Sequence, residues 1–222
     1  MIDCLAVIPA KKTSHRVPAK NLRSFWNGMS LLEIKIRVLK QCNFIKQIIV
    51  SSDDEKALAL AKSLGAYARL RSSDLCNDFV NLKELFQEVL AEFDSNLIYW
   101  AHPTSPFVKP VTIDKAIELA KNNTSNCIIG VEHLQEFLWS EEGPINYDPK
   151  IQPRSQELPP LYRITGGIHI AVAHRFIEEG SLAFNPLMFF NMSKIESLDI
   201  NTEDDWELCV ALSNAAMPSF II

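Results

Sequence analysis

The first 131 residues of this chain alternate between short apolar runs and longer segments that begin with helix-capping residues. Such alternation predicts strands that alternate with helices, and therefore a mostly parallel sheet with helices on both faces. The rest of a single 222-residue domain is expected to complete this α/β fold. We expect strands at 4–10, 47–51, 66–70, 96–101 and 126–131, and helices at 31–40, 82–93 and 112–121 and between Ser52 and Gly65.

Capping signals define where the helices begin and end. Ser30 with Glu33, and Ser52 with Glu55, have the spacing of a capping box, and Asn81 precedes the third helix. Gly65 stands where a helix is expected to stop. In an open α/β sheet, ligands bind beyond the carboxyl ends of the strands, so the segments that follow the strands are the candidate site.

The segment after the first strand is strongly cationic. It reads Ile-Pro-Ala-Lys-Lys-Thr-Ser-His-Arg-Val-Pro-Ala-Lys-Asn over residues 8–21, in a chain whose formal net charge is -5. A loop that could hold a polyphosphate is one interpretation, and a solvated basic loop is the other. Residues 51–54, 71–78 and 102–107 also follow strands, so the four segments are expected to meet at one edge of the sheet.

The alternation breaks over residues 132–163. This stretch is too long for an ordinary connection, and it is expected to be a lid, a partner-contacting arm or a disordered linker. Regular structure is expected again as strands at 167–173, 187–191 and 195–200 and helices at 174–179 and 202–215. The excursion carries five prolines: Pro144, Pro149, Pro153, Pro159 and Pro160.

Several classes of protein are disfavoured. The acidic balance argues against nucleic acid or an anionic membrane as a partner, and no apolar run approaches the roughly 20 residues that cross a bilayer. The N-terminus has no secretory signal pattern, and five scattered cysteines predict buried free thiols in a reducing cytoplasm. The P-loop, dinucleotide, zincin and nucleophile-elbow motifs are all absent from the sequence.

An ordered set of motifs between residues 5 and 212 resembles the acylneuraminate cytidylyltransferase (CMP-sialic acid synthetase) family. The motifs are Ile8-Pro9-Ala10 with Ser14-His15-Arg16-Val17-Pro18-Ala19-Lys20-Asn21, then Ser51-Ser52-Asp53-Asp54, Arg71 with Leu75-Cys76-Asn77-Asp78, His102-Pro103-Thr104-Ser105-Pro106-Phe107, Arg154-x-Gln156-Glu157-Leu158-Pro159 with Tyr162 and Gly166, and Leu198-Asp199-Ile200-Asn201-Thr202-Glu203-Asp204-Asp205.

The resemblance implies a Rossmann-like, GT-A-like nucleotidyltransferase fold. It implies an Mg²⁺-dependent reaction in which a 2-keto sugar acid attacks the α-phosphate of CTP and pyrophosphate leaves. It also implies a homodimer in which 132–163 is an arm that helps to build the neighbour's sugar site.

The resemblance assigns roles to individual residues. Lys20 and Asp199 would act in catalysis, and Asp199 with Asn201 would face the metal. The nucleotide would meet Lys11, Ser14, His15, Arg16, Lys20, Asn21, Arg71, Asp78 and His102. The sugar acid would meet Thr104, Ser105, Arg154, Gln156, Tyr162 and Gly166.

The chain departs from the family pattern at several of these positions. Lys12 and Thr13 replace two loop glycines, which would cost roughly 1 kcal/mol or more each if those positions need a positive φ. His15 replaces lysine, and Asn201 replaces the second carboxylate of an Asp-x-Asp pair. His102 stands for glutamine and Thr165 for asparagine. A different sugar acid, a different nucleotide and a catalytically silent, binding-only relative are the three alternatives.

Some of these residues also have purely structural explanations. Helix capping is the preferred account of Asp53 and Asp54, and it could explain Asn201 and Asp205 at the start of the last helix. Residues 103–106 could form a plain turn. Asp199 is expected inside an apolar strand, where a metal or nucleotide role is the better account.

Overall fold

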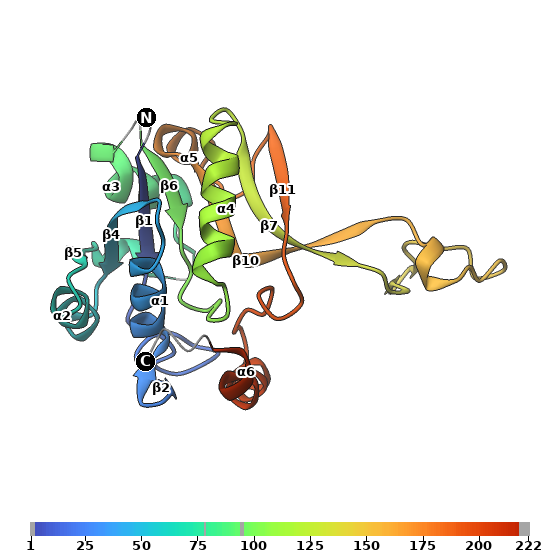
Figure 1. Ribbon diagram of the computed structural model, residues 1–222, viewed down its shortest axis with the longest axis horizontal. Coiled ribbons are helices and arrows are strands. Elements are labelled where there is room, and N and C mark those ends of the chain that lie inside the picture. Colours follow the sequence, from blue (N-terminus) through green and yellow to red (C-terminus); the bar gives the residue numbers. More distant parts are fainter. Residues whose placement is uncertain (1–2, 78, 94–95, 218–222) are drawn as a thin grey trace.

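The computed structural model describes residues 3–77, 79–93 and 96–217 and contains a central seven-stranded sheet (Figure 1). Strand β10 runs antiparallel to its neighbours β6 and β7, whereas the pairs β11–β7, β6–β1, β1–β4 and β4–β5 are parallel. The sheet is therefore mostly parallel, as predicted. Its order is β11 (Leu187–Asn191), β7 (Cys127–Leu134), β10 (Leu161–Val172), β6 (Leu97–Trp100), β1 (Cys4–Pro9), β4 (Ile45–Ser52) and β5 (Tyr67–Leu70).

Helices cover both faces of this sheet, because each strand buries side chains on alternate sides. One core cluster joins the sheet to α1 (Leu31–Lys40), α2 (Glu55–Ser63), α4 (Pro110–Lys121) and α6 (Glu203–Ala216). The other joins it to α3 (Leu82–Leu90) and α5 (Ala173–Glu179). A small hairpin, β2 (Ser24–Trp26) and β3 (Met29–Ser30), packs on α6 through a Phe25–Trp206 edge contact.

The capping predictions are confirmed at two helices and wrong at one. The side chains of Ser30 and Asn81 cap α1 and α3. The cap of α2 is Asp54, whose carboxylate accepts from the Lys56 amide at 2.9 Å. Ser52 instead donates to the carbonyl of Ala10 on the neighbouring chain segment at 2.5 Å, so a long-range contact takes the hydroxyl that the local pattern assigned to the cap.

The strand expected at 195–200 is not present, and this prediction is wrong. The backbone turns there, with the Ser197 amide donating to the Ser193 carbonyl at 2.9 Å. Glu196 fixes the turn by accepting from the Lys109 amide and, at 2.6 Å, from the Thr112 hydroxyl. Alternating apolar residues reproduce the strand pattern, but these contacts with α4 fix a different backbone.

The excursion is a projecting arm. Strands β7 and β10 continue beyond the sheet as an antiparallel ladder that pairs Leu134 with Leu161, and the arm extends well away from the body of the molecule (Figure 1). Its outer part carries β8 (Trp139–Ser140), β9 (Gly143–Pro144) and a 3-10 turn, Ser155–Glu157.

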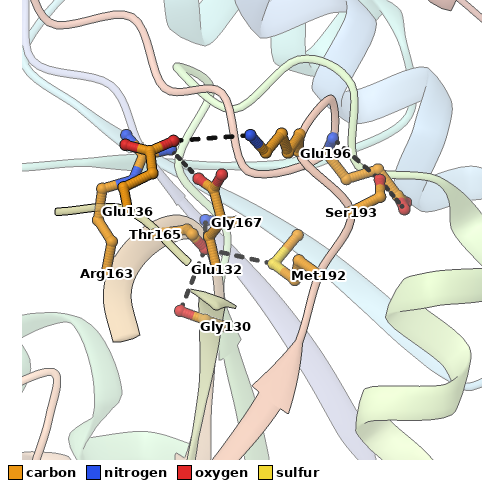
Figure 2. Close-up of polar contacts among 10 residues, drawn as sticks. Gly130, Glu132, Glu136, Arg163, Thr165, Gly167, Met192, Ser193 and Glu196 are labelled. Atoms are coloured by element: carbon orange, nitrogen blue, oxygen red, sulfur yellow. Dashed lines mark hydrogen bonds and ion pairs between the residues drawn. The ribbon is translucent and has the colours of Figure 1, made fainter. Parts of the chain in front are cut away.

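Polar contacts hold the base of the arm (Figure 2). Arg163 forms an ion pair with the buried Glu132 on the adjacent strand, and Lys194 lies 3.7 Å from Glu136. The Thr165 hydroxyl lies 3.2 Å from the Gly130 carbonyl oxygen, which joins the two strands where the ladder enters the sheet.

Two further expectations concern the chain as a whole. All five cysteines are free and buried, as predicted. Within the described ranges, no helix is both long enough and apolar enough to cross a membrane.

Candidate functional site

The cationic segment 8–21 leaves β1 at the carboxyl edge of the sheet and is tied down by backbone contacts. The Lys12 amide donates to Asp53 Oδ1 at 2.7 Å, and Asn21 Nδ2 donates to the Lys11 carbonyl at 3.1 Å. Asp53 is therefore an anchor of the loop. The preferred capping explanation is right for Asp54 and wrong for Asp53.

The loop does not use positive φ angles at the positions where the family has glycine. Neither Lys12 nor Thr13 is in that region, whereas Ala19 has φ 51°. The Ala19 carbonyl accepts from the amides of Leu22 and Arg23, which makes a tight turn before the next segment. The loop thus follows its own backbone path, and the strain considered for Lys12 and Thr13 does not arise.

A cleft of about 500 Å³ lies between the loop and the segment that follows β6. It gathers most of the side chains that the motifs assign to the nucleotide, though not that of Arg71, together with Thr104 from the sugar set. Its lining residues are Pro9, Lys11, Thr13, Ser14, His15, Arg16, Lys20, Asn21, His102, Pro103 and Thr104. The convergence of the loop with 102–107 is therefore confirmed.

A larger depression of about 570 Å³ lies elsewhere on the surface. It is formed where α1 and α2 end and where β4 and β5 begin, with Lys40, Lys46 and Lys62 in its wall. Because ligands of open α/β sheets bind at the carboxyl ends of the strands, we place the functional site in the smaller cleft.

Asp199 lies behind this cleft and is connected to the cationic loop. Its Oδ2 accepts from Asn201 Nδ2 at 2.8 Å, and the Asn201 Oδ1 accepts from Arg16 at 3.3 Å. Lys20 Nζ donates to the Ile200 carbonyl at 2.9 Å. These contacts join residues that lie about 180 positions apart in the sequence and bring the motif residues of both chain ends to one place.

The environment of Asp199 favours its ionised form. Burial alone raises the pKa of this carboxyl, but hydrogen bonds from Thr104, Asn201 and Ser105, together with His102, outweigh burial and place the pKa below its ordinary value. Burial lowers the pKa of Lys20, and the nearby Asp199 carboxylate partly offsets that effect. The site thus pairs a carboxylate with a partly buried ammonium.

The chemistry of Asp199 and Asn201 fits a hard cation such as Mg²⁺, which binds one or two protein oxygens together with phosphates and water. Over the described residues there is no group of three His, Cys, Asp or Glu side chains that could hold a metal by themselves. The Asn201 oxygen points at Arg16 and its nitrogen at Asp199, so Asn201 would have to rotate to become a ligand.

Arg71, which the motifs assign to the nucleotide, does not line this cleft. Arg71 is buried and donates from Nε and Nη2 to the Ser51 hydroxyl and carbonyl at 3.1 and 2.9 Å, so it holds the end of β4. Asp78 lies outside the described residues.

The residues assigned to the sugar acid divide into two groups. Ser105 donates to Asp199 Oδ1 at 3.2 Å, and a Cβ at Gly166 would lie 2.9 Å from the Ser105 hydroxyl. Thr104, Ser105 and Gly166 therefore surround Asp199.

The second group lies on the arm. Tyr162 packs between His133 and Phe189, with ring centroids 5.4 and 4.9 Å away. Arg154 and Gln156 are exposed near the outer part of the arm, and Arg154 pairs with Glu157 at 2.6 Å. One copy of the chain does not bring these residues to its own cleft.

A pair of histidines lies beside Asp199. The rings of His102 and His169 are 5.4 Å apart. Burial lowers the pKa of His102, and burial followed by the field of His102 lowers the pKa of His169 to about 4. Both rings are therefore neutral at pH 7, and His102 offers the cleft a neutral imidazole in place of the family's amide.

Lys35 was not among the predicted residues, although the sequence contains a signal for it. It lies between Leu31 and Leu39 at four-residue intervals, on the apolar stripe of α1. It is 1% exposed, and its Nζ donates to the Ser105 carbonyl at 2.8 Å. A lysine within the apolar stripe of a helix is the sequence pattern that indicates a buried ammonium such as that of Lys35.

The fold, with its cleft at the carboxyl edge of the sheet, is that of an α/β protein of the nucleotidyltransferase type. The solved structure of a CMP:2-keto-3-deoxy-manno-octonic acid synthetase complexed with CTP is similar, with a TM-score of 0.72 and 14% identity over 96% of this chain and 99% of that chain. A 4-diphosphocytidyl-2C-methyl-D-erythritol synthase is similar with a TM-score of 0.71 at 11% identity, over 96% of this chain and 98% of that chain.

The family model for cytidylyltransferases matches residues 5–166, and the chain belongs to the cytidylyltransferase family. A CMP-N,N'-diacetyllegionaminic acid synthase from Legionella pneumophila is 33% identical over 92% of this chain and 93% of its own length. A pseudaminic acid cytidylyltransferase from Campylobacter jejuni is 25% identical over 94% of this chain and 95% of its own length. An N-acylneuraminate cytidylyltransferase A from Danio rerio is 25% identical over 90% of this chain and 48% of its own. The resemblance stated from the motifs is thereby confirmed.

Proposed function

We propose that the protein couples CTP to a nonulosonic acid, a sialic-acid-like 2-keto sugar acid, and releases pyrophosphate. The observation that carries the proposal is the junction of the cationic loop with Asp199, made through Arg16–Asn201 and Lys20–Ile200 at the carboxyl edge of the sheet. The relative named as a CMP-N,N'-diacetyllegionaminic acid synthase, at 33% identity, supports this class of sugar.

In the proposed reaction the anomeric hydroxyl of the sugar acid attacks the α-phosphate in line. A bond forms from that oxygen to the α-phosphorus, the bond to the pyrophosphate oxygen breaks, and the hydroxyl proton is released to water. Lys11, Arg16 and Lys20 line or border the cleft, where they would neutralise the triphosphate and the leaving pyrophosphate. Catalysis then consists mainly of positioning and charge neutralisation.

We assign Asp199 as the protein ligand for Mg²⁺, with triphosphate oxygens and water completing the shell. Bound there, Mg²⁺ would neutralise phosphate charge. Asn201 holds the Asp199 carboxylate and, after rotation, could add an amide oxygen. Asp199→Ala is expected to abolish turnover while leaving the fold intact, as circular dichroism can show, and unchanged turnover would remove Asp199 from the site.

We propose that the arm completes the sugar site of a second copy of the chain. Arg154 and Gln156 do not reach their own cleft, and the arm exposes apolar side chains such as Trp139 and Ile151, which are 59% and 75% exposed. Arg154 is suited to a sugar carboxylate because its guanidinium can bind that group bidentately. Deleting 136–158 should convert a dimer to a monomer in light scattering, and a persistent dimer would contradict the proposal.

A mixing experiment tests the shared site directly. Asp199→Ala and Arg154→Ala should each be inactive as separate homodimers. Co-expressed, they should regain up to about a quarter of wild-type activity, because half of the dimers in a random mixture are mixed and each of these has one intact site. Absence of recovery from a mixture shown to contain mixed dimers would contradict a site built by two chains.

Enzymatic activity is tested with purified protein, CTP, Mg²⁺ and a panel of nonulosonic acids, followed by pyrophosphate release. Release with at least one of the acids is expected. Asn201 and the loop without glycines favour one rival, a catalytically weak or silent relative that binds nucleotide or sugar. Calorimetric binding of CTP or of a sugar without appreciable release for any sugar would establish that rival, and binding of neither would exclude both.

The proposed location is the cytoplasm. The five buried free thiols support a reducing compartment. Fractionation of the native host with an antibody to the chain would test this.

A further inference from the structure

The buried ammonium of Lys35 has no role in the reaction as described so far. Its side chain lies on α1 beneath the segment 102–107 and is not part of the cleft wall. In the described part of the chain Lys35 forms no ion pair, and its hydrogen bond goes to the backbone carbonyl of Ser105 at 2.8 Å. Burying a charge without a carboxylate partner costs free energy that an apolar side chain of similar size would not cost.

Lys35 is connected to the site through Ser105. The Ser105 carbonyl accepts from Lys35, while the Ser105 hydroxyl donates to Asp199 Oδ1 at 3.2 Å. The preceding residue is also fixed, because the Thr104 carbonyl accepts from the Ile200 amide at 2.9 Å. Ser105 is therefore held from the helix on one side and faces Asp199 on the other.

The space around this contact is closely fitted. A Cβ at Gly166 would lie 2.9 Å from the Ser105 hydroxyl and 3.0 Å from Asp199 Cγ. Gly166 therefore leaves little free space around the hydrogen bond from the Ser105 hydroxyl to Asp199. Burial lowers the pKa of Lys35 to about 8, with Cys42 and Asp199 opposing this effect, so the group is an ammonium at pH 7.

We propose that Lys35 is a positioning residue for cytidylyl transfer, which fixes Ser105 through its carbonyl and thereby orients the Asp199 carboxylate. This inference rests on the proposed function. It assigns Lys35 no contact with either substrate. Its removal should therefore lower kcat and leave the KM for CTP nearly unchanged.

The first test is Lys35→Met, assayed for pyrophosphate release. We expect kcat to fall about 10- to 100-fold, the range that misplacement of a catalytic group produces, with the KM for CTP within about twofold of wild type. The thermal midpoint (Tm) should stay the same or rise, because a buried charge is replaced by an apolar chain. Loss of activity with a gain in stability is not expected from a merely structural lysine.

A matched control is available on the same helix. Lys40 Nζ also donates to a backbone carbonyl, that of Leu64 at 3.1 Å, but it lies outside the cleft. Lys40→Met should keep wild-type kcat. An equal loss of kcat in the two variants would overturn the proposal.

Ser105→Ala tests the connection itself. If Lys35 acts through Ser105, Ser105→Ala should reproduce most of the loss in kcat, and the double variant should be no slower than the slower single variant. Wild-type kcat in Ser105→Ala, or fully additive losses, would overturn the proposal, and this holds even if Lys35→Met fails to fold.

Failure of the proposed function would be recognised separately. A wild-type protein that releases pyrophosphate with no sugar would contradict the function, not the link between Lys35 and Ser105. That link can still be measured as non-additivity of the two substitutions in the free energy of unfolding, and strict additivity there would overturn it.

Discussion

Replacing Asn201 by Asp would turn a bridging amide into a second carboxylate beside Asp199. In the structure Asn201 Nδ2 donates to Asp199 Oδ2 at 2.8 Å. An aspartate cannot donate this bond at neutral pH, so Asn201→Asp removes a hydrogen bond to a charged group and adds like-charge repulsion. Both effects lower the free energy of unfolding when no cation is bound.

The size of the effect follows from the geometry. If the two side chains relax until their charges are 4 Å apart, they repel by about 4 kcal/mol at an effective dielectric constant of 20, and by about 1 kcal/mol in water. The cleft is open to water and Arg16 stays near, so we take about 1 kcal/mol for repulsion and about 1.5 kcal/mol for the lost hydrogen bond. At about 2–4 °C per kcal/mol for a domain of this size, Tm should fall by roughly 5–10 °C.

Mg²⁺ should reverse much of this loss in Asn201→Asp. A cation between the two carboxylates removes the repulsion, and binding at ten times Kd adds about 1.4 kcal/mol. Differential scanning fluorimetry with and without Mg²⁺ measures the shift. Asn201→Ala is the control, because it loses the hydrogen bond without gaining a charge and should respond to Mg²⁺ like wild type. An equal Mg²⁺ response in both variants would refute the placement of the metal at Asp199.

Three further predictions concern neighbouring positions. Gly166→Ala should lower the free energy of unfolding by about 1–3 kcal/mol and kcat about tenfold, because the added Cβ would lie 3.0 Å or less from Ser105 and Asp199. Tm and pyrophosphate release measure the two effects, and wild-type values of both would contradict the prediction. Ala19→Gly should raise the free energy of unfolding by roughly 0.5–1 kcal/mol because the φ angle of Ala19 is 51°, whereas Lys12→Gly should lower it. Chemical denaturation measures both changes, and the opposite order would contradict the observed loop path. The pKa of Asp199 lies below its ordinary value of 3.8 in the folded state. The ionised carboxylate therefore stabilises the fold at pH values above 3.8, and this stabilisation is lost as the pH falls through the folded-state pKa. The Tm difference between wild type and Asp199→Asn should therefore shrink below about pH 4, and a constant difference would contradict the shift.

Local sequence signals predicted most of the fold. The strands and helices of the first 131 residues follow from apolar runs and capping residues, because both depend on near neighbours. The predictions failed where a distant contact decided the structure. Ser52 bonds to Ala10 across 42 positions and leaves the cap to Asp54, and Glu196 binds the start of α4 and turns the segment that was expected to be a strand.

In the candidate site, too, local motifs were predicted and contacts between distant residues were not. Most of the cationic side chains of the loop, together with residues 102–104, were identified by their motifs, and they do share one cleft. The tie between Lys12 and Asp53 spans 41 positions, and the tie between Lys35 and Ser105 spans 70. No local pattern encodes such pairs, so the sequence predicted the side chains that line the cleft more readily than those that hold them in place.

Asn201, one departure from the family pattern, lies beside the loop that carries several of the others. The loop lacks glycines, and the second metal carboxylate is replaced by Asn201. In the structure the Asn201 amide accepts from Arg16, on the loop, and donates to Asp199. A carboxylate could accept from Arg16 but could not donate to Asp199, so only the amide can connect the two without a cation. Compared with a carboxylate, the amide carries one negative charge less and provides a fixed connection between the loop and Asp199. Arg16, the loop residue that this amide contacts, matches the family pattern, so the missing glycines and Asn201 are separate changes that lie at one site.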